Sequence, residues 1–109
     1  MIGDMADNTR AVYFIASYDI TEVDRYENEY VPAVVATLAD AGAEVVVATG
    51  SARRVEGEGP GQTVVIRFPS EDAFRRWYDS PAHAPALELR HATTTNATAV
   101  LADEFPPAT

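Results

Sequence analysis

The sequence predicts one α+β domain in which the elements follow the order strand, helix, strand, strand, helix, strand. Four segments combine β-branched and aromatic residues in the way that is typical of strands. Two longer segments instead repeat apolar residues at helical spacing. A chain of 109 residues has room for a single hydrophobic core. We assign this domain to residues 11–104 and expect flexible tails at residues 1–10 and 105–109.

The first strand is predicted at residues 11–20, where neither of the two alternating faces is wholly polar. Both faces of the sheet should therefore be covered. The first helix follows over residues 21–41, with Thr21 as its N-cap and an apolar stripe at helical spacing. Pro32 should kink or break this helix, and Gly42 supplies the left-handed residue that ends it.

The second half of the chain predicts two strands, a helix and a final strand. Residues 43–50 and 62–68 have strand character and are joined by a loop rich in glycine and acids. Ser70 should cap the second helix, which a Ser-Pro pair interrupts before it resumes over residues 82–92. The last strand is predicted at residues 94–102.

This order is that of the ferredoxin-like fold, a split βαβ unit with a four-stranded antiparallel sheet. In this fold the helices cover only one face of the sheet. Because the strands also carry apolar residues on the other face, that face needs a cover of its own. A second copy of the same sheet would supply it, so the sequence predicts a homodimer that forms a dimeric α+β barrel.

Charge and composition exclude several classes of partner. The chain has 8 Lys+Arg, all of them arginine, against 17 Asp+Glu, for a net charge of -9. That charge would repel a nucleic-acid backbone or an anionic membrane, and we expect neither as a partner. The absence of cysteine excludes disulfides and thiolate chemistry. No secretory leader or membrane span is recognisable, so we expect a cytoplasmic location.

Motifs for phosphate, dinucleotide or serine-nucleophile chemistry are absent, and we expect no cofactor. Two histidines, His83 and His91, could take and return a proton at neutral pH. Their spacing places them on roughly the same helical face. No third ligand stands at a recognisable distance from them in the sequence, so no metal site is expected.

Three other charged residues are candidates for a site. Arg90 and Arg67 could hold a carboxylate or stabilise a developing enolate, because a guanidinium is a fixed fork of donors. For each of them the alternative is an ion pair with an acid. Glu56 precedes Gly57 at the rim of a predicted pocket and could act as a general base. Its alternative role is to anchor the loop through backbone N–H groups.

Large aromatic side chains complete the candidate site. Trp77 and Tyr78 belong to the inward side of the second helix, and Tyr26 and Tyr30 to that of the first. Packing in the core explains such residues. They could also shape an apolar pocket that binds a small organic molecule.

An ordered set of residues carries a resemblance to a known family. The set is Glu56-Gly57, Phe68-Pro69-Ser70, Ala73, Trp77-Tyr78, Ser80-Pro81 and Arg90, with Tyr13, Tyr26, Tyr30 and Gly42 before it. In this order the residues resemble the domain-of-unknown-function 1330 family over residues 11–104. Two positions depart from the family's pattern: Ala43 stands where a second glycine is usual, and His83 stands where a tyrosine is usual.

The resemblance implies a dimeric α+β barrel, a group that includes cofactor-independent monooxygenases, isomerases, polyketide cyclases and non-catalytic binding proteins. In the related monooxygenases a tryptophan, a tyrosine and an arginine line a cleft between helices and sheet. Trp77, His83 and Arg90 look like the counterparts of these residues. The fold alone does not transfer a function.

Three functions follow as hypotheses. The first is a small-molecule enzyme without cofactor that performs proton-transfer isomerisation or cyclisation, or oxygenates an electron-rich aromatic compound. His83 or Glu56 would be its base, and Arg90 would stabilise the anion. The second is a dimeric protein that binds a small ligand without turnover. The third is a structural dimer module, which a domain without a cavity larger than a few waters would favour.

Overall fold

The computed structural model describes residues 10–105, so the predicted tails lie outside the described residues except for Arg10 and Phe105. Its elements are β1 (Val12–Ile20), α2 (Val23–Arg25), η1 (Tyr26–Tyr30), α3 (Val31–Leu38), η2 (Ala39–Ala41), β2 (Glu44–Thr49), β3 (Gln62–Phe68), α4 (Glu71–Tyr78), α5 (Ala84–Thr93) and β4 (Thr94–Asp103). Every strand and helix predicted from the sequence is present, within two residues of its predicted ends.

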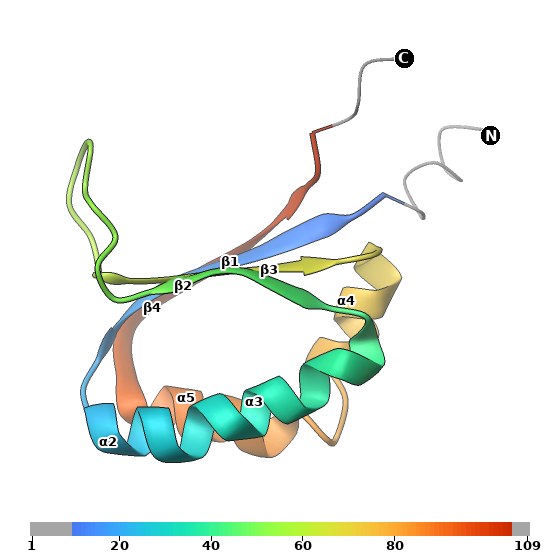
Figure 1. Cartoon of the computed structure of the whole chain (residues 1–109), viewed down its shortest axis with the longest axis horizontal. Helices are drawn as coiled ribbons and strands as arrows, with labels where there is room; N and C mark the ends of the chain where they lie inside the picture. The colour runs from blue at the N-terminus through green and yellow to red at the C-terminus, as the bar shows by residue number, and fades with distance from the viewer. Residues whose placement is uncertain (1–9, 106–109) are drawn as a thin grey trace.

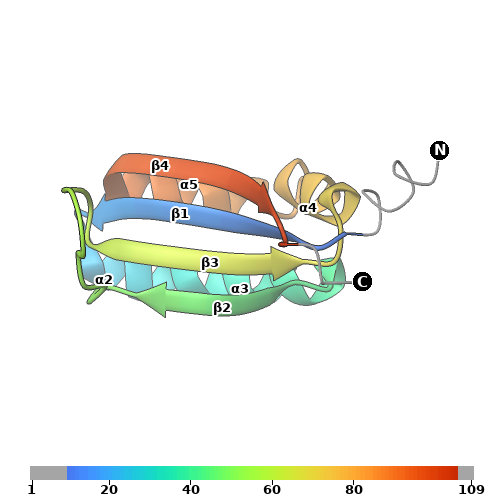
Figure 2. The same ribbon diagram turned by 90° about the horizontal axis from the view of Figure 1, so that it is seen from above.

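The strands form one antiparallel sheet in the order β2-β3-β1-β4. The helices pack on one face of this sheet, and no described element covers the other face (Figures 1 and 2). Residues 50–61, which join β2 to β3, form an arm that rises on the side opposite to the helices (Figure 1). The predicted ferredoxin-like α+β fold is confirmed.

The first helical region departs from the prediction at its start. Its N-cap is Glu22, which makes no side-chain capping bond. The predicted Thr21 cap is wrong, and the Thr21 amide instead donates to a carbonyl at the end of α5 at 2.7 Å. The break expected at Pro32 is not found, because the helical backbone continues through it; the irregularity just before it is η1, a π-helix in which the Tyr26 carbonyl accepts from the Val31 amide. Pro32 then lies in the first turn of α3, where its missing N–H costs little.

Two predicted helix boundaries have the expected chemistry. Gly42 follows η2 with φ 67°, a left-handed conformation that a side chain would disfavour. The Ser70 hydroxyl accepts a hydrogen bond from the Ala73 amide at 3.1 Å and so caps α4.

A β-bulge shapes the edge strand β2. Val45 pairs with Ile66 and Val47 with Val65, which leaves Val46 as the extra residue. Ile66 belongs to the core between the helices and the sheet. Its partner Val45 therefore lies on the helix side of the sheet.

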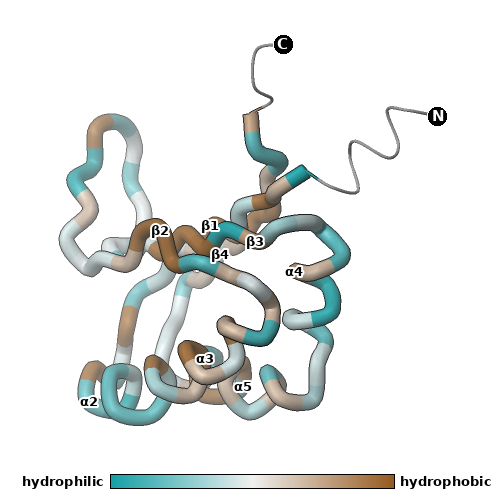
Figure 3. Tube along the Cα trace, turned by 45° about the vertical axis from the view of Figure 1, so that its right-hand side comes forward, coloured by the Kyte–Doolittle hydropathy of each residue, from teal (hydrophilic) through white to brown (hydrophobic). Residues whose placement is uncertain are grey.

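Aromatic side chains fill the space between α4 and the sheet. Phe68 is fully buried, and its ring centroid lies 5.3 Å from that of Phe74 and 5.1 Å from that of Trp77. Figure 3 shows that hydrophobic residues concentrate along the strands, whereas the helices mix hydrophobic and hydrophilic positions. Within residues 10–105 no helix is long and apolar enough to cross a membrane.

Replacing Phe68 by alanine should destabilise the fold by about 3–5 kcal/mol, because it removes a buried ring and leaves a cavity between α4 and the sheet. Urea denaturation followed by circular dichroism measures this. Val23→Ala is the control, since Val23 is 53% exposed at the start of α2 and should change stability by less than about 0.5 kcal/mol. Equal stabilities of the two variants would contradict the assigned core.

Candidate functional site

A small cavity lies between the helices and the sheet. Its volume is about 10 Å³, room for about one water molecule. Its polar and aromatic lining consists of Tyr18, Tyr30, Trp77, Tyr78, His83 and Arg90, together with Phe14 and small or aliphatic residues of the sheet. The structure thus brings together five side chains that the sequence singled out, and it adds Tyr18, which sequence reasoning missed.

A tight turn between α4 and α5 carries His83 into the interior. Pro81 prevents α4 from continuing. The Ser80 hydroxyl donates to the Trp77 carbonyl at 2.9 Å, and the His83 amide donates to the Ser80 carbonyl at 3.1 Å. His83 precedes α5 as its N-cap residue and is 2% exposed. Its ring lies against the Trp77 indole, with centroids 4.0 Å apart.

The surroundings of His83 determine its tautomer and its charge. Nδ1 lies 3.1 Å from the Tyr78 carbonyl oxygen. Because a carbonyl only accepts, Nδ1 carries the proton and Nε2 keeps its lone pair. Burial lowers the pKa of His83 below 6.5, the hydrogen bond to the Tyr78 carbonyl opposes part of this effect, and the charge of Arg90 adds a smaller lowering. His83 is therefore a neutral base at neutral pH.

Arg90 brings a positive charge into the same layer without a counter-ion. It is 6% exposed and is the one buried arginine of residues 10–105. Its guanidinium carbon lies 5.6 Å from the centroid of the Tyr18 ring. Within the described chain the guanidinium has no ion pair and no hydrogen bond, so the alternative of an internal ion pair is not found. Burying an unpaired charge costs several kcal/mol, which the fold must offset elsewhere.

The unpartnered nitrogens of both residues reach open space. In the described part of the chain, no side-chain nitrogen or oxygen is both sealed from solvent and without a hydrogen-bond partner. Nε2 of His83 and the guanidinium of Arg90 have no hydrogen-bond partner there, so each keeps some accessible surface, and both residues line the cavity. A bound molecule could therefore receive hydrogen bonds from Arg90 and give a proton to His83.

Three tyrosines from β1 and η1 pack together beside the cavity; Tyr18 and Tyr30 line it, and Tyr26 lines the adjoining groove. The hydroxyls of Tyr18 and Tyr26 are hydrogen-bonded at 2.5 Å, and the rings of Tyr26 and Tyr30 have centroids 5.0 Å apart. Burial raises the pKa of Tyr18 above its usual 10.0 and that of Tyr30 to about 12, so both remain protonated at neutral pH. Tyr18 could have been found from the sequence, because it is a hydroxyl-bearing residue on the otherwise apolar face of β1.

An apolar groove lies next to the cavity, between α3 and the β2 edge of the sheet. Its volume is about 120 Å³. Four residues, Tyr18, Tyr30, Val64 and Ile66, line both the cavity and the groove. The remaining lining comes from Tyr26, from α3 and from β2, namely Val31, Val34, Val35, Leu38, Val45 and Ala48. The cavity and the groove thus lie on either side of these four side chains, and we call the two together the edge site.

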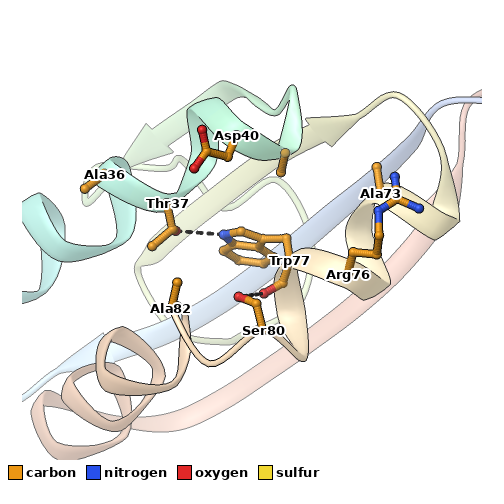
Figure 4. A pocket seen from close by; sticks show the side chains of 9 residues that line it. Ala36, Thr37, Asp40, Ala73, Arg76, Trp77, Ser80 and Ala82 are labelled. Atoms are coloured by element: carbon orange, nitrogen blue, oxygen red, sulfur yellow. Dashed lines mark hydrogen bonds between the residues drawn. The ribbon is translucent and has the colours of Figure 1, made fainter.

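Trp77 separates the cavity from a second groove, of about 280 Å³, on the helix side of the molecule. Figure 4 shows this groove with Asp40 on one wall and Arg76 on another. The Trp77 Nε1–H donates to the Thr37 hydroxyl at 2.8 Å, and this bond holds the indole in place. Trp77 is therefore both a core residue and a wall of the cavity.

The structure leaves three of the predicted site residues outside both the cavity and the groove, and a fourth, Tyr26, lines the groove alone. His91 is exposed on α5 while His83 is buried before it, so the expectation that they share a helical face is wrong. Glu56 is exposed on the arm, on the opposite side of the sheet from His83. Arg67 forms the ion pair expected as its alternative, with Nε 3.2 Å from Glu104 Oε1, and Tyr13 donates to the same oxygen at 3.0 Å.

Candidate metal ligands do not gather at this site. Among the residues that the structure describes, no three His, Cys, Asp or Glu side chains are close enough to hold a metal ion. The edge site instead offers a neutral base, a cation and protonated tyrosine hydroxyls.

One family model matches the chain. It is described as a domain of unknown function (DUF1330), and the match covers residues 11–104. The chain belongs to the DUF1330 family. The family that the sequence resembles is therefore confirmed. None of the curated proteins compared with this DUF1330 chain matches it.

Solved structures share the fold of this DUF1330 domain at low sequence identity. A protein of unknown function from Rhodopseudomonas palustris is 14% identical, with a TM-score of 0.77 over 95% of this chain and 89% of that one. The cofactor-independent oxygenase SnoaB from Streptomyces nogalater is 18% identical, with a TM-score of 0.59 over 92% and 96%. A dimeric ferredoxin-like protein of unknown function from Bacteroides fragilis is 16% identical, with a TM-score of 0.59 over 86% and 96%.

Acidification should protonate His83 and quench the fluorescence of the adjacent Trp77, the single tryptophan of the chain. Because burial and Arg90 lower the pKa of His83, the midpoint should lie below 6.5, and Arg90→Met should move it upward. Because the pKa of this histidine is lower in the folded protein than in the unfolded chain, the unfolded chain binds the proton more readily. The free energy of unfolding should therefore fall as the pH drops from about 6.5 to the lower pKa of the folded protein. A fluorescence titration with parallel urea melts measures both effects.

Two histidine variants control this titration. His83→Gln should abolish the transition, and His91→Gln should leave it unchanged because His91 is exposed on α5. A transition that follows His91 would contradict the assignment.

Proposed function

We propose that this DUF1330 domain is a small-molecule enzyme that uses no cofactor and performs proton-transfer chemistry in the edge site. The observation that carries the proposal is the pairing of a buried neutral imidazole with a buried unpaired guanidinium on one cavity. A base and a cation in a site of low polarity are the minimum needed to remove a proton from carbon and to stabilise the resulting oxyanion.

In the proposed reaction His83 and Arg90 act on opposite ends of one substrate fragment. Nε2 of His83 takes a proton from a carbon next to a carbonyl group, and the C–H electron pair moves to form an enolate. Arg90 stabilises the enolate oxygen. The imidazolium then returns the proton to another carbon, which gives an isomer and regenerates the neutral base. Neither a metal nor an external oxidant enters this sequence.

Isomerisation and cyclisation both begin with this proton removal. Oxygenation of an electron-rich aromatic anion would begin in the same way, with dioxygen as the oxidant, and the fold shared with the oxygenase SnoaB supports keeping it as a second reaction class. Glu56 is not proposed as the base, because the arm holds it away from the cavity.

A binding role without turnover is the alternative function, and one observation favours it. The cavity beside His83 has room for only about one water. The adjoining groove, of about 120 Å³, has a larger volume than a few water molecules occupy. It therefore does not favour a purely structural dimer module. A ligand held mainly in the groove would be bound without reaching the imidazole.

We further propose that two copies pair through the open face of the sheet. Val100 lies on this face, opposite Ile15, and is 57% exposed. Val55 on the arm and Phe105 after β4 are each 90% exposed. A second sheet would cover these apolar side chains. Nucleic acids and membranes are not proposed as partners at a net charge of -9, and a cytoplasmic location stays a prediction of the sequence.

Proton transfer can be tested without knowing the substrate. Wild-type protein in deuterium oxide should catalyse hydrogen exchange at the carbon next to the carbonyl in at least one member of a panel of enolisable ketones and β-dicarbonyl compounds, followed by proton NMR. His83→Gln should lower the exchange rate by about 10²–10⁴-fold. His91→Gln should exchange at the wild-type rate. Unchanged exchange in the His83→Gln protein would exclude His83 as the base, and no exchange with any panel member would favour the binding role.

The dimer is tested by light scattering at micromolar concentration, where the wild-type protein should have twice the monomer mass. Val100→Asp should shift the protein to monomer, because it places a charge in the apolar interface. Val23→Asp is the matched control, since Val23 is 53% exposed on the helix side. A monomeric wild-type protein would refute the barrel.

A further inference from the structure

We infer that the edge site binds an amphiphilic monoanion, with an oxyanion head on Arg90 and an apolar body in the groove between α3 and β2. The inference names the substrate class of the proposed enzyme and so rests on the same cavity. It requires binding only, and it would hold equally for a protein without turnover.

The head group follows from the state of Arg90. Its guanidinium is buried, unpaired within the described chain, and within reach of open space. Charge-assisted hydrogen bonds to a carboxylate, enolate or phenolate oxygen would satisfy it, and guanidinium donors suit such oxygens well. The chain as a whole carries a charge of -9 and repels anions. An anion would therefore be held by this local charge and not by the general field of the protein.

The body of the ligand follows from the lining of the groove. Residues from α3, including Val31 and Val35, face Val45 and Ala48 of β2, and no charged side chain lines the groove. The lining residues that carry a polar group on the side chain are the three tyrosines Tyr18, Tyr26 and Tyr30. Binding of an apolar body to such a surface is favourable, whereas binding of polar groups there is unfavourable because they would be buried without partners. A short alkyl chain or a single aromatic ring fits this chemistry.

The cavity and the groove share four of their wall residues. Tyr18 and Tyr30 line both the cavity and the groove, and Arg90 lies over the Tyr18 ring. A molecule in the groove would place its oxyanion between the Tyr18 and Tyr30 side chains to reach Arg90 beside His83. The small volume of the cavity limits the head to a few atoms, whereas the groove can hold a larger body.

The helix-side groove offers a weaker site for the same ligand. Asp40 stands on its wall, and its negative charge would repel an anion. Its one positive residue, Arg76, is exposed to water, where a single ion pair contributes little. The charge distribution therefore favours the edge site.

The experiment compares 4-phenylbutyrate, its neutral amide and acetate as probes, by titration calorimetry and Trp77 fluorescence. The wild-type protein should bind 4-phenylbutyrate about tenfold or more tightly than the amide, because only the carboxylate pairs with Arg90. Acetate, which has no apolar body, should also bind about tenfold or more weakly.

Three variants assign the two halves of the ligand to the two halves of the site. Arg90→Met should reduce the preference for the carboxylate over the amide to less than about twofold, and unchanged amide affinity would show that the groove is intact. Ala48→Phe, which fills the groove from an exposed position on β2, should weaken 4-phenylbutyrate to about the level of acetate. Arg75→Met is the control, because Arg75 is an exposed arginine paired with Glu71, and its affinities should equal those of the wild type.

The inference is overturned if the amide binds as tightly as the carboxylate, if Arg90→Met keeps the preference, if Ala48→Phe binds 4-phenylbutyrate as the wild type does, or if no probe binds at millimolar concentration. The outcome is separable from that of the enzyme proposal. His83→Gln should keep the preference for the carboxylate even where it abolishes hydrogen exchange. Binding without exchange would leave this inference standing and refute the enzyme.

Discussion

The aromatic packing between α4 and the sheet is the interaction on which the rest of this DUF1330 structure depends. Phe68, Phe74 and Trp77 hold α4 on β3 and β1, with centroid separations of 5.1–6.1 Å. Because Trp77 is fixed by this packing and by its bond to Thr37, the turn that follows it can press His83 against the indole. The position of the candidate base is thus a consequence of core packing.

The same layer contains a feature that packing does not explain. Arg90 is buried among aromatic rings without a carboxylate, and its interaction with the Tyr18 ring offsets only part of the desolvation cost. Proteins retain such costs mainly at functional sites, where stability is exchanged for binding or catalysis. The neighbouring imidazole, kept neutral by burial and by this charge, makes the same cavity suited to proton transfer.

The two faces of the sheet have different chemistry. The helix face carries the aromatic core, the cation and the base. The open face carries Val100 and the cluster in which Tyr13 and Arg67 both bond Glu104. That cluster satisfies the charge of Arg67 within the sheet surface, so Arg67 and Arg90 have opposite environments despite their identical side chains.

The sequence by itself determined the order of the elements, their bounds to within two residues, the αL end at Gly42 and the cap at Ser70, because these depend on local propensity, spacing and turn chemistry. It also singled out the aromatic residues and the titratable pair His83 and Arg90. Only the tertiary structure decided which of the candidates meet. It excluded His91 and Glu56 from the cavity and added Tyr18, because these placements depend on which way a turn, an arm and a strand face present their side chains. Whether an arginine forms an ion pair also depends on contacts between residues distant in sequence. Arg67 pairs with Glu104 on the sheet, and Arg90 has no acidic partner within the described chain.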